Sequence, residues 1–421
     1  MELAIKDKIF NVFIFGRQNT RAGEYGLGSY LKELANCMKF YNNVKLHFVY
    51  IESKIHKELT VDTENGITSI YVPAPLYTNP LHDKYYNIKL YAKRITDLMF
   101  DFVSGKENLI FQFNLSAEFF LAKEIKKRFN GKIIYVVHCF MWYFDFYGNE
   151  KKFKEWEENN LQKENTPYSN DRMICEISDH IICVTNHART DLINKYLLPK
   201  EKISVVHNGM NIGLDYVQKA IVEQKKAELG FQESDKIILF VGRIDDCKGI
   251  LFLLNAFYFI LKEIPDAHLV LIGEGSNITR WFNTCQGIWR NVHFTGFLSR
   301  QTVEDFYKIA DIGVIPSLFE WCSYVALEMM SHRLPVVVTA VGGLDEIYEH
   351  GKTALKVRIE TKEDGQLAIN EQELADNLLL LLKSDETARL IGNQAFKTVK
   401  HRFTDKIMTD NLINIYTNLT I

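Results

Sequence analysis

The sequence lacks the excess of basic residues that a nucleic-acid-binding surface needs. Its 50 lysine and arginine residues are outnumbered by 53 aspartate and glutamate residues, and the formal net charge is −3. Residues up to about 202 are basic by roughly three charges and the rest is acidic by about six. This asymmetry is compatible with an anionic acceptor or peripheral contact with a membrane, although a solvated charged surface is the favoured interpretation. We expect no nucleic-acid partner.

Paired cysteines are also lacking. The seven cysteines are odd in number, and no two have the C-x-x-C spacing. Neither a disulfide framework nor a zinc site is therefore indicated. Reduced thiols are typical of cytosolic proteins, so the sequence predicts a cytoplasmic location.

Long apolar runs are lacking too. The opening sequence MELAIKDKIF is too charged for a signal peptide. The longest apolar stretch, around Leu251–Leu261, is interrupted by Asn255 and is too short to span a bilayer. We therefore expect no transmembrane segment.

The size and the apolar content favour two domains with an α/β architecture. The 421 residues are enough for two domains of ordinary size, and 47% of them are apolar or aromatic. Short β-branched runs alternate with amphipathic helical patterns along the chain. The turn at Asn208–Gly209 is interpreted as the hinge, which places the domains at 1–208 and 209–403, with a last helix at about 404–421.

The stretch Asp311–Gly351 has the clearest pattern in the chain. Ile312–Ile315 predicts a short strand, and Ser323 is suited to cap a helix that continues through Met330. Val336–Val338 predicts a second buried strand. A strand, a loop and a helix thus occur twice in succession.

Two carboxylates within this stretch are candidate ligand-binding residues. Glu320 lies in the loop after the first strand, and Glu328 lies inside an otherwise apolar helix. Ligands bind at the carboxyl ends of the strands in open parallel sheets. A buried carboxylate needs hydrogen-bond donors. Taken alone, each glutamate is equally compatible with an exposed position.

A strand, a glycine-bearing loop and a helix open the first domain. Ile9–Phe15 predicts a buried strand, Gly23, Gly26 and Gly28 lie in the loop, and a helix is expected from about Ser29. Such a layout lets backbone amides approach an anion at the helix N-terminus. A flexible connector is the alternative.

His138 closes a later strand, Lys132–Val137, and is a candidate site residue because of that position. A backbone-bonded structural histidine is the alternative. The sequence FMWYFDFYGNEKKFKEWEENNLQKEN follows within a few residues. Its aromatic half is suited to line an acceptor pocket, and its charged half predicts an exposed helix.

Two cations flank a loop in the second domain. Arg243 and Lys248 lie between the predicted strand Lys236–Val241 and the predicted helix Ile250–Ile264. Together with the helix N-terminus they are suited to bind a diphosphate. The alternative is that both are surface cations paired with acidic neighbours.

These motifs together resemble family 4 of the retaining glycosyltransferases. The resemblance rests on G-R-x-x-x-x-K-G, on P-S-x-x-E-x7-E, and on the P-V-V and G-G-x-x-E that follow. It is strong over residues 236–351 and looser elsewhere. Many members have Phe-Gly where this chain has Cys322–Ser323, so the resemblance does not indicate which sugar is bound.

The resemblance implies an α/β fold of the GT-B type, in which two Rossmann-like domains with parallel sheets face each other across a deep cleft. The first domain would bind the acceptor and the second the donor, with the last helix crossing back onto the first. Arg243 and Lys248 would stabilise the leaving diphosphate. The further donor-binding residues that it implies are Gly26, Gly28, Gly273, Leu298, Glu320, Ser323, Tyr324 and Glu328.

By the same resemblance, the activity is transfer of a sugar, such as a hexose, from a nucleotide diphosphate sugar to an acceptor hydroxyl with retention of anomeric configuration. UDP is the expected nucleotide. The catalytic residues would be Glu320, His138, Arg243 and Lys248. No cofactor and no metal are expected, because no Asp-x-Asp follows a strand. The acceptor stays open among a saccharide, a lipid-linked glycan and a peptide. A nucleotide-sugar epimerase and a non-catalytic donor-binding protein are the alternatives.

Overall fold

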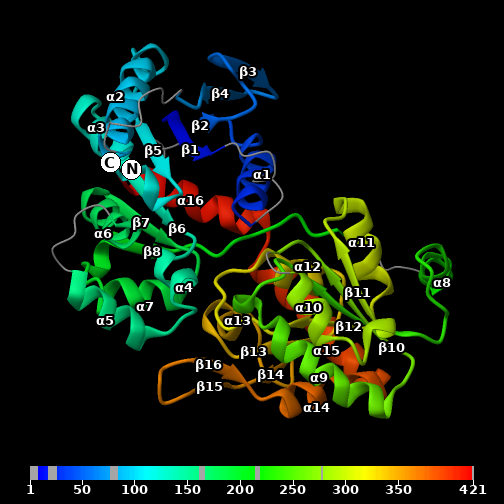
Figure 1. The fold of residues 1–421 in the computed structure, drawn as a ribbon. Coiled ribbons are helices and arrows are strands. Elements are labelled where there is room, and N and C mark those ends of the chain that lie inside the picture. Colours follow the sequence, from blue (N-terminus) through cyan, green and yellow to red (C-terminus); the bar gives the residue numbers. More distant parts are fainter. Residues whose placement is uncertain are drawn as a thin grey trace. The chain divides into compact units, whose positions relative to one another are not determined.

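The structure is a computed structural model that describes residues 8–17, 26–75, 84–160, 166–213, 219–275 and 278–419. The chain forms two compact units (Figure 1). Unit 1 consists of Met1–Met141, Asn160–Asn211 and Asp405–Ile421, and unit 2 consists of Trp142–Asn159 and Ile212–Thr404. Each unit is built around its own β-sheet.

Unit 1 contains an eight-stranded sheet in the order β3-β4-β2-β1-β5-β6-β7-β8. Central strands β1 and β5 are almost entirely buried, which suits their continuous apolar sequences. The predicted strand Lys132–Val137 is confirmed as β6. The strands are β1 (Phe10–Arg17), β2 (Val44–Ser53), β3 (Thr60–Glu64), β4 (Ile67–Pro73), β5 (Leu109–Phe113), β6 (Lys132–Val137), β7 (His180–Cys183) and β8 (Ile203–Val205).

Edge strand β3 departs from the expected all-parallel pairing, because it runs antiparallel to β4. Asn65 and Gly66 join the two strands, and both have positive φ, 50° and 79°. These are the torsions of a tight hairpin turn. Four of the five residues of β3 are exposed. Its sequence TVDTE therefore carries no apolar pattern by which it could be predicted.

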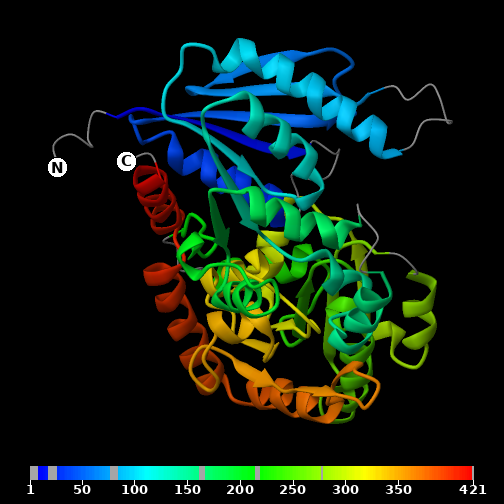
Figure 2. The same cartoon turned by 90° about the vertical axis from the view of Figure 1, so that its left-hand side faces the viewer.

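Helices cover both faces of the first sheet. Figure 2 shows α2 over one face and α1 against the other. The last helix, α16, packs beside α1, and its Tyr416 hydroxyl donates to Gln112 Oε1 on β5 at 2.7 Å. The end of the chain thus completes the core of unit 1. The helices are α1 (Gly26–Met38), α2 (Lys84–Val103), α3 (Phe119–Arg128), α6 (Pro167–Ile177), α7 (Asn186–Asn194) and α16 (Asp405–Leu419).

Unit 2 contains a six-stranded parallel sheet in the order β11-β10-β9-β12-β13-β14. Its first strand, β9, lies between β10 and β12, so the strand order reverses there. Such a reversal opens a crevice at the carboxyl ends of the strands. The strands are β9 (Lys236–Val241), β10 (Ala267–Ile272), β11 (Val292–Gly296), β12 (Ile312–Ile315), β13 (Val336–Thr339) and β14 (Leu355–Val357), and a separate hairpin pairs β15 (Ile359–Thr361) with β16 (Leu367–Ile369).

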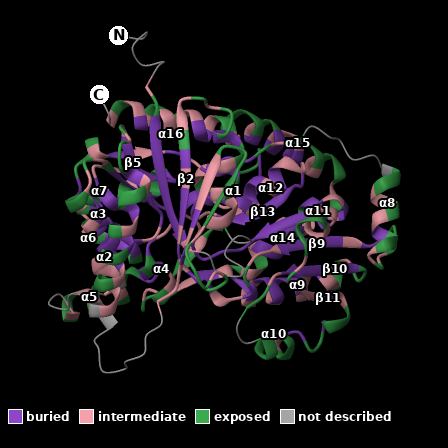
Figure 3. Ribbon diagram, turned by 90° about the horizontal axis from the view of Figure 1, so that it is seen from above, coloured by how far each residue is buried: buried purple, intermediate pink, exposed green. Residues whose placement is uncertain are grey.

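The helices of unit 2 shield its sheet from solvent. The strands are mostly buried and the exposed residues gather on helices such as α8 and α10 (Figure 3). Within the described ranges, no helix is long and apolar enough to cross a membrane. The helices are α8 (Lys219–Glu228), α9 (Ile250–Glu263), α10 (Ile278–Thr284), α11 (Arg300–Ile309), α12 (Tyr324–Ser331), α13 (Gly342–Ile347), α14 (Glu371–Lys383) and α15 (Asp385–Arg402).

One segment lies in a different unit from its neighbours in the chain. Helices α4 (Met141–Asp145) and α5 (Glu150–Asn160) follow strand β6 of unit 1, yet Trp142–Asn159 packs within unit 2. The sequence-based division at 208/209 keeps this segment in the first domain. The difference arises because Tyr143 and Phe144 pack against the unit 2 loop that contains Phe319. The other aromatic residues of the segment pack mainly on one another.

Candidate active site

The carboxyl edge of the second sheet gathers most of the predicted donor-site residues. Arg243 and Lys248 follow β9, Gly273 follows β10, Leu298 follows β11 and Glu320 follows β12. Parallel strands end at a common edge, so loops that are far apart in the sequence meet there.

The loops after β9 and β10 are in direct backbone contact. A Cβ atom on Gly273 would lie only 1.8 Å from the carbonyl oxygen of Gly242, and the φ of Gly273 is 139°. The amide of Gly242 donates to Ile272 O at 2.9 Å. Glycine is therefore required at 273, since any side chain would push the two loops apart.

A short turn holds Lys248 against the end of β12. Asp245 caps the 3₁₀ turn Asp246–Lys248 by accepting from the Lys248 amide at 3.1 Å. Gly249 follows in the left-handed conformation with φ 70°, and a Cβ there would lie 1.9 Å from Pro316 O. Helix α9 begins at the next residue, so its N-terminus also points to this edge.

Lys248 and Glu320 form an ion pair. Lys248 Nζ lies 2.6 Å from Glu320 Oε2, with side chains that are 21% and 14% exposed. Ser317 Oγ and the Trp321 amide donate to the same carboxylate at 3.2 and 3.3 Å. The sequence predicts both residues at the donor, but not that they neutralise each other.

Arg243 is the more accessible cation. Its side chain is 44% exposed and pairs with Asp245 at 3.3 Å. The guanidinium also lies over the Phe144 ring, with its central carbon 5.2 Å from the ring centroid. A bound diphosphate can therefore reach Arg243 without displacing a buried group.

The predicted alternative, in which acidic neighbours neutralise both cations, holds for one of them. Asp245 pairs with Arg243. Asp246 instead pairs with Arg280, at 2.9 Å. The partner of Lys248 is Glu320, 72 residues later.

Glu328 on α12 is buried and already has donors. Tyr307 Oη donates to one carboxylate oxygen at 2.8 Å and Arg300 Nη1 to the other at 3.2 Å. Burial raises the pKa of Glu328, and Arg300 and Tyr307 oppose that rise. The requirement for hydrogen-bond donors is thus met within the protein. The sequence-based prediction includes neither donor, although Arg300 opens a helix directly after the loop that carries Leu298.

Ser323 caps α12 as predicted, because its hydroxyl accepts from the Ala326 amide at 3.4 Å. The Tyr324 side chain is buried, so the predicted contact with a ligand would involve its backbone amide rather than its phenol. Leu298 is half-buried beside the exposed Phe297. The roles of these three residues stay predictions.

His138 lies at the carboxyl edge of the unit 1 sheet, after β6. Its Nε2 is 3.1 Å from Asn114 Oδ1, and the Asn114 amide nitrogen donates to Phe15 O at 3.0 Å. This second bond fixes which atom of Asn114 is the oxygen, so His138 Nε2 carries the proton and Nδ1 is an acceptor. Burial lowers the pKa of His138 to about 4. The ring is therefore neutral near pH 7 and supplies no positive charge.

Gly26 and Gly28 belong to a helix rather than to a loop. Helix α1 begins at Gly26, three residues earlier than expected, so both glycines lie in its first turn. The first amides of a helix have no partner within the helix. In α1 these are the amides of the first-turn residues, which include both glycines. The predicted Gly23 lies outside the described residues.

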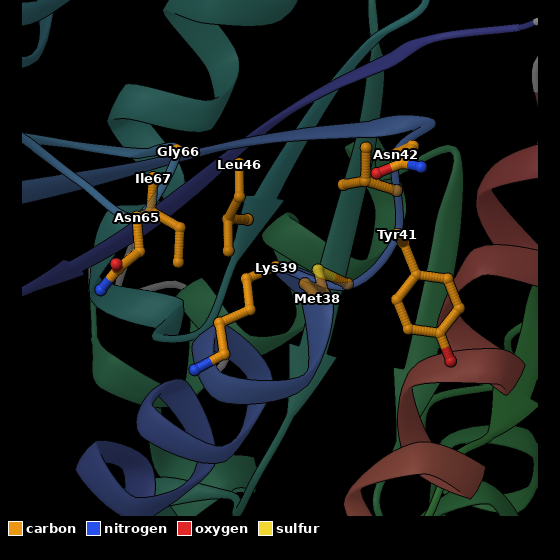
Figure 4. Close-up of a pocket in the computed structure, with 9 residues that line it drawn as sticks. Met38, Lys39, Tyr41, Asn42, Leu46, Asn65, Gly66 and Ile67 are labelled. Carbon is orange, nitrogen blue, oxygen red and sulfur yellow. The ribbon is translucent and has the colours of Figure 1, made fainter.

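A surface pocket in unit 1 lies away from these residues. Met38, Lys39 and Tyr41 at the end of α1 line it together with Leu46 and Ile67 (Figure 4). It lies near the starts of β2 and β4, whereas Asn114 and His138 follow the ends of β5 and β6. The pocket is thus at the amino edge of the sheet and contains none of the predicted site residues.

Two Rossmann-like units, each built around its own parallel or mostly parallel sheet, define the class by fold: the protein has the GT-B architecture. Sucrose-phosphate synthase from Thermosynechococcus elongatus has the same fold, with a TM-score of 0.76 at 19% identity over 97% of this chain and 99% of that one. HepE from Anabaena, solved with UDP-glucose, has a TM-score of 0.69 at 16% identity, and the match covers 97% of this chain and 99% of HepE.

Sequence comparison identifies the family. Residues 26–214 match Glycosyltransferase Family 4, and residues 235–384 match Glycosyl transferases group 1. The chain belongs to this family. It is 28% identical to an uncharacterized glycosyltransferase of Methanocaldococcus jannaschii, over 70% of this chain and 79% of the relative. It is 30% identical to D-inositol 3-phosphate glycosyltransferase of Corynebacterium efficiens, over 61% of this chain and 62% of that relative.

Proposed function

We propose that the protein transfers a sugar from a nucleoside diphosphate sugar, with UDP as the nucleotide, to an acceptor hydroxyl and retains the anomeric configuration. The observation that carries the proposal is the pair Arg243 and Lys248 beside the N-terminus of α9. Two cations and free helix amides favour the charge that grows on a departing diphosphate. Hence no metal ion is assigned to the reaction.

The Lys248–Glu320 pair supports an exchange of partners during donor binding. The diphosphate carries more negative charge than one carboxylate, so it attracts the Lys248 ammonium away from Glu320. Ser317 and the Trp321 amide still hold the carboxylate after the exchange. Glu320 then offers its charge to the sugar, where positive charge develops as the glycosidic bond breaks.

Retention follows if the acceptor attacks from the side that the leaving group vacates. The acceptor oxygen forms the new bond to the anomeric carbon, the bond to the diphosphate breaks, and the departing phosphate oxygen takes the acceptor proton. No enzymic nucleophile is required. We assign the neutral His138 to a hydrogen-bonding role, with Nδ1 as an acceptor for a sugar hydroxyl.

Similar proteins support the donor and leave the acceptor open. HepE was solved with UDP and with UDP-glucose. The relatives include an enzyme named for D-inositol 3-phosphate and one named for L-malate. The chain covers 62% and 59% of these two relatives. The acceptor of this protein stays open among a saccharide, a lipid-linked glycan and a peptide. All seven cysteines lie in the described ranges and none of them forms a disulfide, which fits the proposed cytoplasmic location.

A donor screen tests the proposal. We expect one nucleoside diphosphate sugar among UDP-, GDP- and ADP-sugars to raise the melting temperature most, because ligand binding stabilises the native state. Nucleotide release should then need an acceptor, and the product should keep the donor's anomeric configuration by NMR. Release without acceptor, together with a changed sugar, would favour an epimerase. Binding without any turnover would favour a non-catalytic protein.

A further inference from the structure

The aromatic start of the segment Trp142–Asn159 packs against the loop that carries Glu320. The Tyr143 ring lies 5.4 Å from the ring of Phe319 and 5.3 Å from that of Trp321, centroid to centroid. These two residues flank Glu320 in the sequence. The segment therefore contacts the donor-site loop on both sides of its carboxylate.

The next residue of the segment, Phe144, contacts both donor-site loops. Its ring meets the ring of Phe319 edge-on at 5.3 Å. The guanidinium of Arg243 lies over the same ring at 5.2 Å. Arg243 thus has the carboxylate of Asp245 as one partner and an aromatic face as another. Both partners belong to unit 2.

The turn at residues 146–149, which follows α4, is fixed on its far side by contacts with the β15–β16 hairpin. Asn149 Nδ2 donates to Asp364 O at 3.1 Å. Gly148 has φ 72°, and a Cβ there would lie 2.9 Å from Leu367 Cδ1. Because the turn is held at both ends, the Phe144 ring has a fixed support.

We propose that Phe144 is a positioning residue of the diphosphate site and holds the Arg243 guanidinium in place through its ring face. An arginine that is 44% exposed loses considerable side-chain entropy when it binds a ligand. Stacking on a fixed ring lowers that loss, since fewer rotamers are populated beforehand, and a ring face does not compete with phosphate oxygens for the guanidinium N–H groups. The assignment rests on the proposed function, because it gives Arg243 its ligand.

Three substitutions separate this role from simple packing. Phe144→Leu keeps an apolar contact with Phe319 but removes the ring face, and Phe144→Tyr keeps the ring. Phe146→Leu is the matched control, because Phe146 belongs to the same turn and its ring contacts Phe153 and Trp156. Affinity for UDP, with GDP and ADP in parallel, is measured by calorimetry, and the melting temperature is recorded for each variant.

We expect Phe144→Leu to weaken binding of the nucleoside diphosphate by about two- to fivefold, the range of an exposed cation–π contact. Phe144→Tyr should restore affinity, and Phe146→Leu should leave it unchanged whatever its effect on melting temperature. In an Arg243→Ala background, Phe144→Leu should weaken binding no further. Equal losses with and without Arg243 would overturn the inference, as would normal affinity in Phe144→Leu. Absence of nucleoside diphosphate binding by the wild type would instead overturn the proposed function, and the inference with it.

Discussion

Lys248 and Glu320 are 72 residues apart in the chain, yet the ammonium of one lies 2.6 Å from the carboxylate of the other. They come together because β12 pairs with β9, which brings the two strand-end loops side by side. The lysine proposed to bind the diphosphate and the glutamate proposed to face the sugar are therefore coupled through this ion pair.

Loss of either cation should reduce turnover steeply. Arg243→Ala and Lys248→Ala are each expected to lower kcat about 100-fold, because each removes a group that stabilises charge on the leaving diphosphate. Steady-state kinetics with the donor found in the screen provide the measurement. Lys383→Ala is a suitable control, since Lys383 pairs with Glu263 on an exposed surface. Wild-type rates in both site variants would refute the diphosphate site.

Glu320→Gln should separate catalysis from nucleotide binding. The substitution removes the charge proposed to face the reacting sugar, so kcat should fall. It also removes the ion-pair partner of Lys248, so UDP should bind at least as tightly as to the wild type. Calorimetry with UDP and initial-rate kinetics test both outcomes. Weaker UDP binding with an unchanged kcat would contradict the partner exchange.

Glu328→Gln should act on donor affinity. Glu328 is a predicted binding residue for the nucleotide-sugar donor. A carboxylate accepts hydrogen bonds from such a ligand that are about twice as strong as those accepted by a neutral amide. We therefore expect the KM for the nucleotide sugar to rise by about fivefold while kcat changes little. Glu304→Gln provides the control, because Glu304 also pairs with Arg300 but is more exposed than Glu328. A fall in kcat at constant KM would assign Glu328 to the chemical step instead.

Stability should depend on pH through Glu118 in unit 1. Burial raises the pKa of Glu118 to about 7, and the charge of Arg17 opposes the rise. The folded protein then holds this proton more tightly than the unfolded chain does. The contribution of Glu118 to the free energy of unfolding is therefore full below the unfolded pKa, about 4, and is lost as the pH rises through about 7.

Glu118→Gln removes this titration. The glutamine keeps an oxygen that can accept from the Asn114 backbone amide, which in the wild type donates to Glu118 Oε2. Relative to wild type, the variant should gain unfolding free energy on the order of 3 kcal/mol between about pH 4 and about pH 8. Chemical denaturation at the two pH values measures the difference. Glu124→Gln, on the exposed side of α3, should show no such gain. A pH-independent difference for Glu118→Gln would mean that the carboxyl does not titrate in this range.

Chelation should leave the rate nearly unchanged. Arg243, Lys248 and the amides of α9 are proposed to carry the charge that a metal ion carries in other transferases. Assays with excess EDTA, followed by added Mg²⁺ or Mn²⁺, test this expectation. A rate that disappears with EDTA and returns with either ion would contradict the proposed mechanism.

The sequence alone determined several of the central strands and helices and the loops that follow them. The apolar runs of β6 and β9 mark strands whose predicted bounds coincide with the structure, and the Ser323 cap marks the start of α12. These features are local, because a strand's apolar run and a helix cap each depend on neighbours within a few residues. The loops with Arg243 and Glu320 could thus be chosen from their positions alone.

Only the tertiary structure decided which partners these residues have. The pairing of Lys248 with Glu320 depends on strand order, and that of Arg300 with Glu328 depends on two helices meeting. The contact of Phe144 with Arg243 depends on a segment that packs in unit 2 although it follows a strand of unit 1. Such contacts join residues far apart in the chain. They stabilise the protein only after folding has buried these groups and brought the opposite charges together. No local pattern in the sequence encodes them.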